Sequence, residues 1–255
     1  MNFTHTPKLR IIPKLEIKNQ NLIKGVKFEG LRIVGDPILF AENYYKDKAD
    51  QINIIDIVAS LYSRDNIYEI INKITNKIFI PVNVGGGITD IEHIKKLLEV
   101  GADRIIINSH ALRNPSFLID VKNIFGEQFI SISIEAKKIK GKYYCMMDHG
   151  RENSGIEVLE WIHRLKEIKV CEIILNSIDN DGMEQGFDAE LLDDCVKLID
   201  CPLVVSGGIS TYEHFLNLSK KKIDGICSST AFHFNRTNIF KLKEYLKKNN
   251  CNINL

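Results

Sequence analysis

The stretch that decides the fold occurs twice: residues 80–89 read IPVNVGGGIT, and residues 201–210 read CPLVVSGGIS. The two stretches lie 201 − 80 = 121 residues apart. The same shift relates residues further along the chain, namely Glu92-His93 to Glu213-His214, Asp103 to Asp224, and Asn108-Ser109 to Ser229-Thr230. A long echo at fixed spacing indicates two copies of one structural unit. Each copy reads as an apolar strand, a glycine turn, a helix, a second strand and a small polar turn.

Eight apolar, β-branched runs alternate with eight amphipathic segments over the whole chain. The runs cover residues 10–17, 52–57, 80–84, 104–108, 129–135, 172–177, 202–206 and 224–228. The amphipathic segments cover residues 37–48, 66–77, 90–100, 115–125, 156–168, 189–199, 211–220 and 238–248. This alternation predicts an α/β fold, a (β/α)8 TIM barrel with an internal two-fold repeat of half-barrels, in a single domain of residues 1–255. An open doubly wound sheet is the alternative, but its Gly-x-Gly-x-x-Gly fingerprint is missing.

Two long segments interrupt the alternation, and we expect both to be loops. Residues 18–36 follow the first strand and contain Lys24, and residues 137–154 follow the fifth. The second segment contains a predicted hairpin around Lys140-Gly141-Lys142. Because barrel enzymes build their sites on the loops after strands, both segments and Lys24 are candidates for substrate contact.

Composition limits the partners and the compartment. Thirty-four Lys and Arg against 33 Asp and Glu leave a net charge of +1, which argues against nucleic acid or a membrane surface as partner. The six cysteines form no Cys-x-x-Cys pair and read as free thiols of a reducing compartment. No apolar run reaches transmembrane length, so we expect a cytoplasmic protein. No residue cluster has metal-ligand spacing, and we expect neither metal nor cofactor.

The repeated glycine turns predict two phosphate-binding sites, because backbone N–H groups at strand ends and helix starts form anion cradles. Gly87, Asn108 and Ser109 would form the first cradle. Gly207, Gly208, Ser229 and Thr230 would form the second, flanked by Asp181-Gly182. Two cradles related by symmetry suggest one substrate carrying two phosphates. The alternative is that these glycines merely permit tight strand-to-helix turns.

Carboxylates end two strands that face each other across a barrel of eight. Glu16 ends the first strand and Glu135 the fifth, and strand alternation points both into the mouth, where they could act as acid and base. The alternative is an ion pair with a nearby lysine: Lys14, Lys137 or Lys138. Asp56 and Asn176 end the second and sixth strands and form another opposed pair for substrate contact. Among the histidines, His149 could reach a substrate, whereas His93, His110, His214 and His233 read as structural.

Several motifs of the chain together resemble a known family, the cyclase subunit of imidazole glycerol phosphate synthase (HisF type). The resemblance runs from about Arg10 to Leu246. Its markers are Arg10-Ile11-Ile12-Pro13, Val34-Gly35-Asp36-Pro37, Val84-Gly85-Gly86-Gly87-Ile88, Ser177-Ile178-Asp179-Asn180-Asp181-Gly182 and Phe232-His233-Phe234.

The resemblance implies a partner and a substrate. A glutaminase subunit would dock on the opposite face of the barrel, at Asp103, and form a heterodimer. Its ammonia would pass a gate of Arg10, Gln51, Arg104 and Glu172 and cross the barrel. At the mouth it would meet a bis-phosphorylated ribulosyl aminoimidazole carboxamide. The products would be imidazole glycerol phosphate and aminoimidazole carboxamide ribotide.

The sequence also departs from the family, which has aspartates at the positions of Glu16 and Glu135, Cys at Lys14, usually Thr at Asn176, and Glu at Gln51. A divergent branch that also has Asn at the Asn176 position is associated with amidino-group formation on surface sugars. Three functions therefore stay open. The first is the histidine-pathway cyclase, the second is a relative that delivers ammonia to a sugar, and the third is a catalytically silent barrel that binds phosphorylated metabolites.

Overall fold

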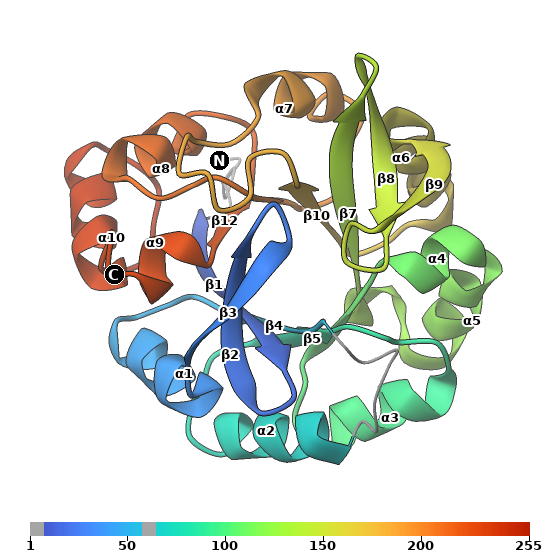
Figure 1. Ribbon diagram of the computed structural model, residues 1–255, viewed down its shortest axis with the longest axis horizontal. Helices are drawn as coiled ribbons and strands as arrows, with labels where there is room; N and C mark the ends of the chain where they lie inside the picture. The colour runs from blue at the N-terminus through green and yellow to red at the C-terminus, as the bar shows by residue number, and fades with distance from the viewer. Residues whose placement is uncertain (1–7, 58–64) are drawn as a thin grey trace, which may run out of the picture.

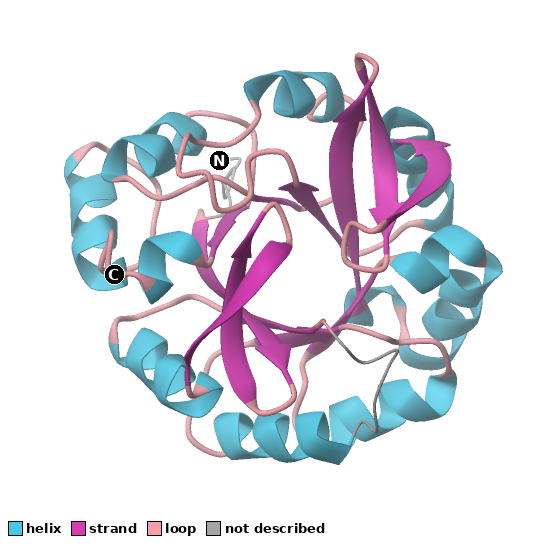
Figure 2. Cartoon of the chain, viewed as in Figure 1, coloured by secondary structure: helices cyan, strands magenta, loops and turns pink. Residues whose placement is uncertain are grey.

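The computed structural model describes residues 8–57 and 65–255, and within them parallel strands close into a barrel surrounded by helices (Figure 1; Figure 2). In ring order these strands are β1 (Arg10–Lys18), β4 (Ile52–Asp56), β5 (Val82–Gly85), β6 (Arg104–Ile107), β7 (Ile130–Ile139), β10 (Glu172–Ser177), β11 (Leu203–Ser206) and β12 (Gly225–Ser228). The ring closes through the parallel pairing of β7 with β10. The predicted (β/α)8 barrel is confirmed, with β1 and β7 on opposite sides of the ring.

Each strand is apolar because both of its faces are covered. On β1, Ile11 and Leu15 pack outward into the large core shared with the helices, whereas Ile12 points into the barrel. There Ile12 joins a small inner cluster with Ile106, Ile174, Val204 and Cys227. The alternation along β1 therefore places Arg10, Ile12, Lys14 and Glu16 one above the other along the inside of the barrel.

Helices follow each barrel strand: α1 (Pro37–Lys46), α2 (Asp65–Thr75), α3 (Ile91–Glu99), α4 (Ser109–Arg113), α5 (Ser116–Phe125), α6 (Val158–Ile168), α7 (Ala189–Cys195), α8 (Tyr212–Ser219), α9 (Thr230–His233) and α10 (Ile239–Lys248), with a 3₁₀ turn η1 (Glu127–Phe129). The small polar turns expected after β6 and β12 are in fact the short helices α4 and α9. Five and four residues are too few to show helical periodicity in the sequence.

The 121-residue repeat recurs as repeated hydrogen bonds. Asp90 caps α3 by accepting from the His93 N–H at 2.8 Å. Thr211, at 90 + 121, caps α8 by accepting from the His214 N–H at 3.3 Å. At the strand starts, Asp103 accepts from the Val82 N–H at 2.8 Å. Asp224, the equivalent residue 121 positions later, accepts from the Leu203 N–H at 2.9 Å at the start of β11. Much of the sequence echo therefore specifies architecture.

The repeated glycines are also fixed by packing. Gly86 and Gly207 both have positive φ, 105° and 113°. A Cβ at Gly86 would lie 2.0 Å from the carbonyl oxygen of Asp56, and one at Gly207 would lie 2.5 Å from that of Ser177. These two contacts are again 121 residues apart, so the turn must be glycine for the backbone to pass the neighbouring strand.

The first long segment is not a loop, contrary to expectation. It folds as the hairpin β2 (Asn21–Val26) and β3 (Glu29–Gly35), which extends β1 through antiparallel pairing. Its turn residues Lys27 and Phe28 both have positive φ, 51° and 66°, as in the tight turns that close hairpins. Such turns usually contain Gly or Asn, and because neither is present here the sequence did not predict the hairpin. The hairpin lies across the barrel mouth (Figure 1).

The predicted second hairpin is confirmed. β7 pairs antiparallel with β8 (Lys142–Met147) around Lys140 and Gly141, and β8 pairs with β9 (Glu152–Glu157). Two residues with positive φ form this turn, 49° at Lys140 and 84° at Gly141. The resulting arm carries the turn of residues 148–150 back over the mouth.

Candidate functional site

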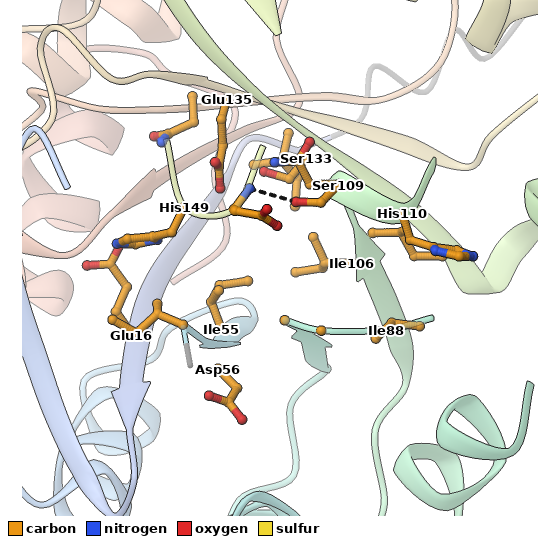
Figure 3. Close-up of a pocket in the computed structure, with 18 of the residues that line it drawn as sticks. Glu16, Ile55, Asp56, Ile88, Ile106, Ser109, His110, Ser133, Glu135 and His149 are labelled. Carbon is orange, nitrogen blue, oxygen red and sulfur yellow. Dashed lines mark hydrogen bonds between the residues drawn. The ribbon is translucent and has the colours of Figure 1, made fainter. Parts of the chain in front are cut away.

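A cavity of about 170 Å³ opens at the carboxyl ends of the barrel strands (Figure 3). This is the end where barrel enzymes hold their substrates. Seven of the residues singled out from the sequence line it, namely Glu16, Asp56, Gly87, Asn108, Ser109, Glu135 and Asn176. His149, expected to be within reach of a substrate, lines it too. The structure thus brings together both predicted carboxylates and the whole first cradle.

The second group of predicted residues lies outside this cavity: Lys24, Asp181, Gly182, Gly207, Gly208, Ser229 and Thr230. The β2–β3 hairpin packs directly on the loop after β10. The Lys27 N–H donates to the Asp181 carbonyl at 2.8 Å, and a Cβ at Gly182 would lie 2.8 Å from the Gly25 carbonyl oxygen. Ser229 is buried with its hydroxyl donating to the Lys14 carbonyl at 2.8 Å. In this conformation the second cradle is closed.

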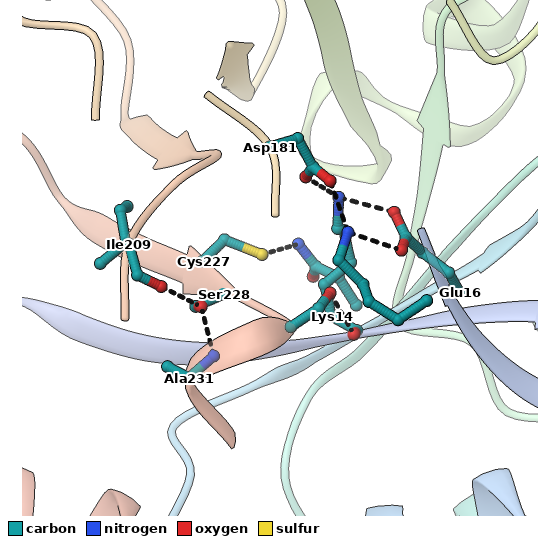
Figure 4. A network of polar contacts seen from close by, with 10 residues as sticks. Lys14, Glu16, Asp181, Ile209, Cys227, Ser228 and Ala231 are labelled. Carbon is teal, nitrogen blue, oxygen red and sulfur yellow. Dashed lines mark hydrogen bonds and ion pairs between the residues drawn. The ribbon is translucent and has the colours of Figure 1, made fainter. Parts of the chain in front are cut away.

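Glu16 belongs to a buried cluster of four charged side chains (Figure 4). Its Oε1 lies 2.9 Å from the Lys14 Nζ, and its Oε2 lies 3.2 Å from the Lys24 Nζ. Asp181 completes the cluster, 2.5 Å from the Lys24 Nζ and 3.7 Å from the Lys14 Nζ. The structure thus gives Glu16 the lysine partner that the sequence offered as an alternative. It also gives Lys24 and Asp181 each other as partners.

This cluster keeps Glu16 ionised. Burial alone would raise the pKa of the Glu16 carboxyl, but the ammonium groups of Lys14 and Lys24 outweigh burial and hold this pKa well below its ordinary range. Burial would likewise lower the pKa of Lys14, but Glu16 and Asp181 raise it. Two positive and two negative charges therefore balance inside the mouth. Neither Glu16 nor Lys14 is therefore suited to exchange a proton near neutral pH.

Glu135 has a different environment at the end of the opposite strand. It accepts a hydrogen bond from the Gly150 N–H at 3.1 Å. Burial raises its pKa to about 7, although Lys14 and the Gly150 N–H act in the other direction. Glu135 can therefore both take up and release a proton near neutral pH, which Glu16 cannot. Two carboxylates with such different environments suit two different roles.

Asn176 lies next to Glu135, because the two are direct partners in the β10–β7 register. Its Oδ1 is buried and has no hydrogen-bond partner within the described residues. Asp56, at the end of the opposite strand β4, lines the same cavity. The predicted second opposed pair thus lines the same cavity as Glu16 and Glu135.

The four residues predicted as a gate form one cluster at the other end of the barrel. Arg10 donates to the Gln51 Oε1 at 2.8 Å and to the Glu172 Oε2 at 2.6 Å. Arg104 lies 3.8 Å from the same Glu172 oxygen. Glu172 is fully buried, whereas both arginines are partly exposed. Asp103, predicted to meet a partner, is exposed on this face.

Hydrogen bonds connect this gate cluster to the cavity at the mouth of the barrel. Gln51 donates through Nε2 to the Asn53 Oδ1 at 2.7 Å, and Asn53 itself lines the mouth cavity. The Asn53 Nδ2 is in turn 3.8 Å from the Cys227 Sγ. One polar residue therefore separates the gate cluster from the floor of the cavity.

Sequence reasoning missed several residues of the site, namely Lys14 as a member of the mouth, Phe28, Arg113, Asp148 and Arg151. The alternation along β1 was enough to place Lys14 inside the barrel beside Glu16. The other four belong to the β2–β3 hairpin, to α4 and to the turn after β8, where the residue types do not repeat at the 121-residue shift. No repeat signal could reveal them.

Three other histidines pack against aromatic side chains. His233 is buried, and its Nδ1 lies 2.6 Å from the Tyr44 hydroxyl. His93 is also buried, beside Tyr68. His110 packs edge-on against Phe117 but also lines the cavity. The expectation that these side chains pack is consistent with the contacts, and His110 in addition contributes to the wall of the site.

Three further features of the described residues concern metals, thiols and membranes. Within residues 8–57 and 65–255, no group of three His, Cys, Asp or Glu side chains could hold a metal ion. All six cysteines are free thiols. Across the same described ranges, no helix has the length and apolar character needed to cross a membrane.

Comparison with known proteins identifies the family. Residues 10–238 match the family described as "Histidine biosynthesis protein". The chain is similar to the imidazole glycerol phosphate synthase subunit HisF of Natranaerobius thermophilus, with 35% identity over 96% of this chain and 98% of that protein. It is 39% identical to the subunit HisF of Wolinella succinogenes over the same shares, and 42% identical to that of Legionella pneumophila over 81% of this chain and 98% of the relative. The chain therefore belongs to the histidine biosynthesis protein family, together with the HisF subunits of imidazole glycerol phosphate synthase.

Proposed function

We propose that this protein is the cyclase subunit of imidazole glycerol phosphate synthase, a lyase that uses ammonia from a glutaminase partner. It would convert the bis-phosphorylated ribulosyl aminoimidazole carboxamide into imidazole glycerol phosphate and aminoimidazole carboxamide ribotide, in the cytoplasm. One observation carries the proposal beyond family membership. A carboxyl group with a pKa near 7, Glu135, faces a cavity that also contains the ionised Glu16 and the first phosphate cradle.

The two carboxylates suit successive parts of this reaction. Addition of ammonia to a carbonyl carbon first places positive charge on nitrogen, and after proton transfer to oxygen water leaves to give an imine, which is positively charged while protonated. The ionised Glu16 would stabilise that charge. Ring closure and release of the second product require protons to move to and from nitrogen and oxygen atoms. Glu135 would carry these protons, since a general acid–base works best when its pKa is near the working pH.

Substrate placement would use the two cradles. The first, at Gly87, Asn108 and Ser109, is open to the cavity. The second, at Gly208, Ser229 and Thr230, lies beneath the contact between the β2–β3 hairpin and the loop after β10. Binding of the second phosphate would require this contact to separate, after which the hairpin could close again over the substrate.

Delivery of ammonia would use the opposite face. The cluster of Arg10, Gln51, Arg104 and Glu172 lies at the strand starts, where barrel enzymes do not perform chemistry. The Gln51–Asn53 hydrogen bond joins it to the cavity floor. We place the glutaminase subunit on this face, in contact with Asp103, so that ammonia enters the barrel without meeting bulk water.

A second candidate function rests on the Lys14–Glu16 ion pair. An ammonium group 2.9 Å from the Glu16 carboxylate adds to the site a fixed charge that the resemblance does not predict. Together with Asn176, it favours a relative that delivers ammonia for amidino modification of a sugar. Both functions use delivered nitrogen, so they differ only in the acceptor molecule.

One assay separates these possibilities. The purified chain, without any partner, is supplied with the ribulosyl carboxamide and ammonium at high pH, where free ammonia is abundant. We expect turnover, loss of turnover in Glu135→Gln, and no change in Glu167→Gln, which alters an exposed glutamate on α6. No turnover by the unaltered chain, with intact bis-phosphate binding, would favour the sugar-modifying relative. Full activity of Glu135→Gln would remove Glu135 from the reaction.

A further inference from the structure

The turn between β8 and β9 has a constrained backbone. Asp148, His149 and Gly150 all have positive φ, 49°, 58° and 76°. Only glycine adopts this conformation freely, and each of the other two residues costs on the order of 1 kcal/mol there. Such a conformation persists where the surrounding structure fixes it, and it is enriched at sites that contact ligands.

A second insertion holds the His149 ring. The imidazole stacks on the Phe28 ring of the β2–β3 hairpin, with centroids 4.3 Å apart and planes inclined by 13°. Burial lowers the pKa of His149 to about 4, so the ring is neutral at physiological pH. The two long insertions, which lie after opposite strands of the barrel, therefore meet at this pair of rings.

The stacked ring has an unused hydrogen-bonding atom at the substrate cavity. The Nε2 of His149 is buried and has no hydrogen-bond partner in the part of the chain that is described, and the residue lines the cavity. Figure 3 shows the His149 ring between Glu16 and Glu135 at the pocket. The next residue in the turn, Gly150, donates its N–H to Glu135 at 3.1 Å.

We propose that His149 is a substrate-binding residue, whose Nε2 forms a hydrogen bond with a hydroxyl group on the open-chain sugar part of the substrate. This inference rests on the proposed function and deepens it by naming a further contact. A hydroxyl fits either neutral tautomer, because it can donate or accept. The Phe28 stack fixes the ring direction, and the Gly150 N–H links the same turn to Glu135. Binding at His149 thereby also fixes the position of Glu135.

The test compares variants that separate the ring from its nitrogens. His149→Phe keeps an aromatic ring on Phe28 but removes Nε2, and His149→Asn, which tolerates positive φ, keeps polarity without the ring. We expect each to raise the KM for the ribulosyl carboxamide about tenfold, the usual loss for one buried hydrogen bond, with a smaller change in kcat. His163→Phe, at an exposed histidine on α6, is the control and should leave both constants unchanged.

A direct readout does not depend on turnover. In protein labelled with ¹⁵N-histidine, the His149 Nε2 resonance, assigned by its absence in His149→Phe, should shift when ribulose 1,5-bisphosphate is added. An unchanged KM in both His149 variants, or binding of that bisphosphate without any shift, would overturn the inference while the proposed function stands. Absence of both turnover and bisphosphate binding in the unaltered protein would instead overturn the proposed function.

Discussion

The Lys14 Nζ lies 2.9 Å from the Glu16 Oε1, and both side chains are buried at the mouth of the barrel. The pair is part of a balanced cluster with Lys24 and Asp181. The extra methylene that distinguishes Glu16 from aspartate carries its carboxylate between the two ammonium groups. Lys14 and Glu16 therefore form a matched pair, and a change to either should be read together with the other.

Removal of Lys14 should destabilise the fold. Lys14→Met leaves three buried charges of which two are negative, and an uncompensated buried charge costs about 3–5 kcal/mol. Because the pKa of Glu16 is depressed in the native protein, its contribution to stability is present above its ordinary pKa of 4.5 and declines as pH falls below that value. The free energy of unfolding from urea denaturation should therefore show a large loss at pH 7 and a smaller loss at pH 3.5.

An exposed lysine provides the matched control. Lys73 pairs with Glu69 on the surface of α2, and Lys73→Met should leave the unfolding free energy almost unchanged. Equal effects of the two substitutions would contradict the view that the mouth cluster stabilises the fold. The double change Lys14→Met with Glu16→Gln should recover part of the lost stability, because it removes one charge of each sign.

Replacement of Glu135 should have a pH-dependent effect of opposite sign. Its pKa is raised to about 7 from an ordinary value of 4.5, so its ionised form is unfavourable in the native state. The resulting cost is absent below pH 4.5, grows between pH 4.5 and 7, and is complete above pH 7. Glu135→Gln should therefore be more stable than the unaltered protein at pH 8, by about 1–3 kcal/mol, and similar to it at pH 4.

The same titration should appear in catalysis. With free ammonia held constant, kcat/KM of the unaltered chain should rise with pH through an inflection near 7 if Glu135 acts as the base. A profile without an inflection between pH 6 and 8 would contradict this role. Glu16 should produce no inflection in that range, because its pKa is held far below it.

The sequence predicted the barrel well because its signals are periodic. The 121-residue echo, from Gly86 to Gly207 and from Asp103 to Asp224, reflects contacts that each half needs for the same physical reason. The residues at strand ends, Glu16 and Glu135, were found because alternation along a strand determines which side chains point inward.

The sequence could not reveal whether Glu16 transfers protons or forms an ion pair. Glu16 was compatible with proton transfer and with an ion pair. The positions of the Lys14 and Lys24 side chains, the second brought in by the hairpin, decide between them. The hairpin itself was missed because its turn contains Lys27 and Phe28 rather than glycine or asparagine. Likewise, Phe28 and His149 are 121 residues apart and lie in corresponding turns of the two insertions, since β2 and β8 are related by the same shift. Their residue types differ, however, and their stacking depends on how the two insertions fold.

Asp103 should contribute to partner binding through its charge. Its Oδ2 accepts from the Val82 N–H, so charge reversal would disturb the strand as well as the surface. Asp103→Asn keeps an acceptor for that N–H and removes only the charge. We expect weaker binding of a HisF-partner glutaminase in a calorimetric titration, about two- to tenfold, with ammonia-dependent turnover unchanged.

The repeat supplies the control for this experiment. Asp224→Asn makes the same chemical change in the same structural setting, since Asp224 accepts from the Leu203 N–H at the start of β11. If both substitutions weaken the complex equally, or if neither does, Asp103 has no specific role in the interface.

The first phosphate cradle should be sensitive to a negative charge. Ser109 begins α4, lines the cavity and accepts from the Asp148 N–H at 2.9 Å through its hydroxyl oxygen. Ser109→Asp retains an acceptor for that N–H but places a carboxylate where a phosphate would bind, so repulsion should oppose binding.

In thermal-shift measurements, ribulose 1,5-bisphosphate should protect the unaltered protein at a much lower concentration than inorganic phosphate, because it bridges two sites. Ser109→Asp should remove that advantage, whereas Ser116→Asp, at an exposed position on α5, should retain it. Full protection of Ser109→Asp by the bisphosphate would show that the phosphates bind elsewhere and that Gly87, Asn108 and Ser109 form a turn of purely architectural importance.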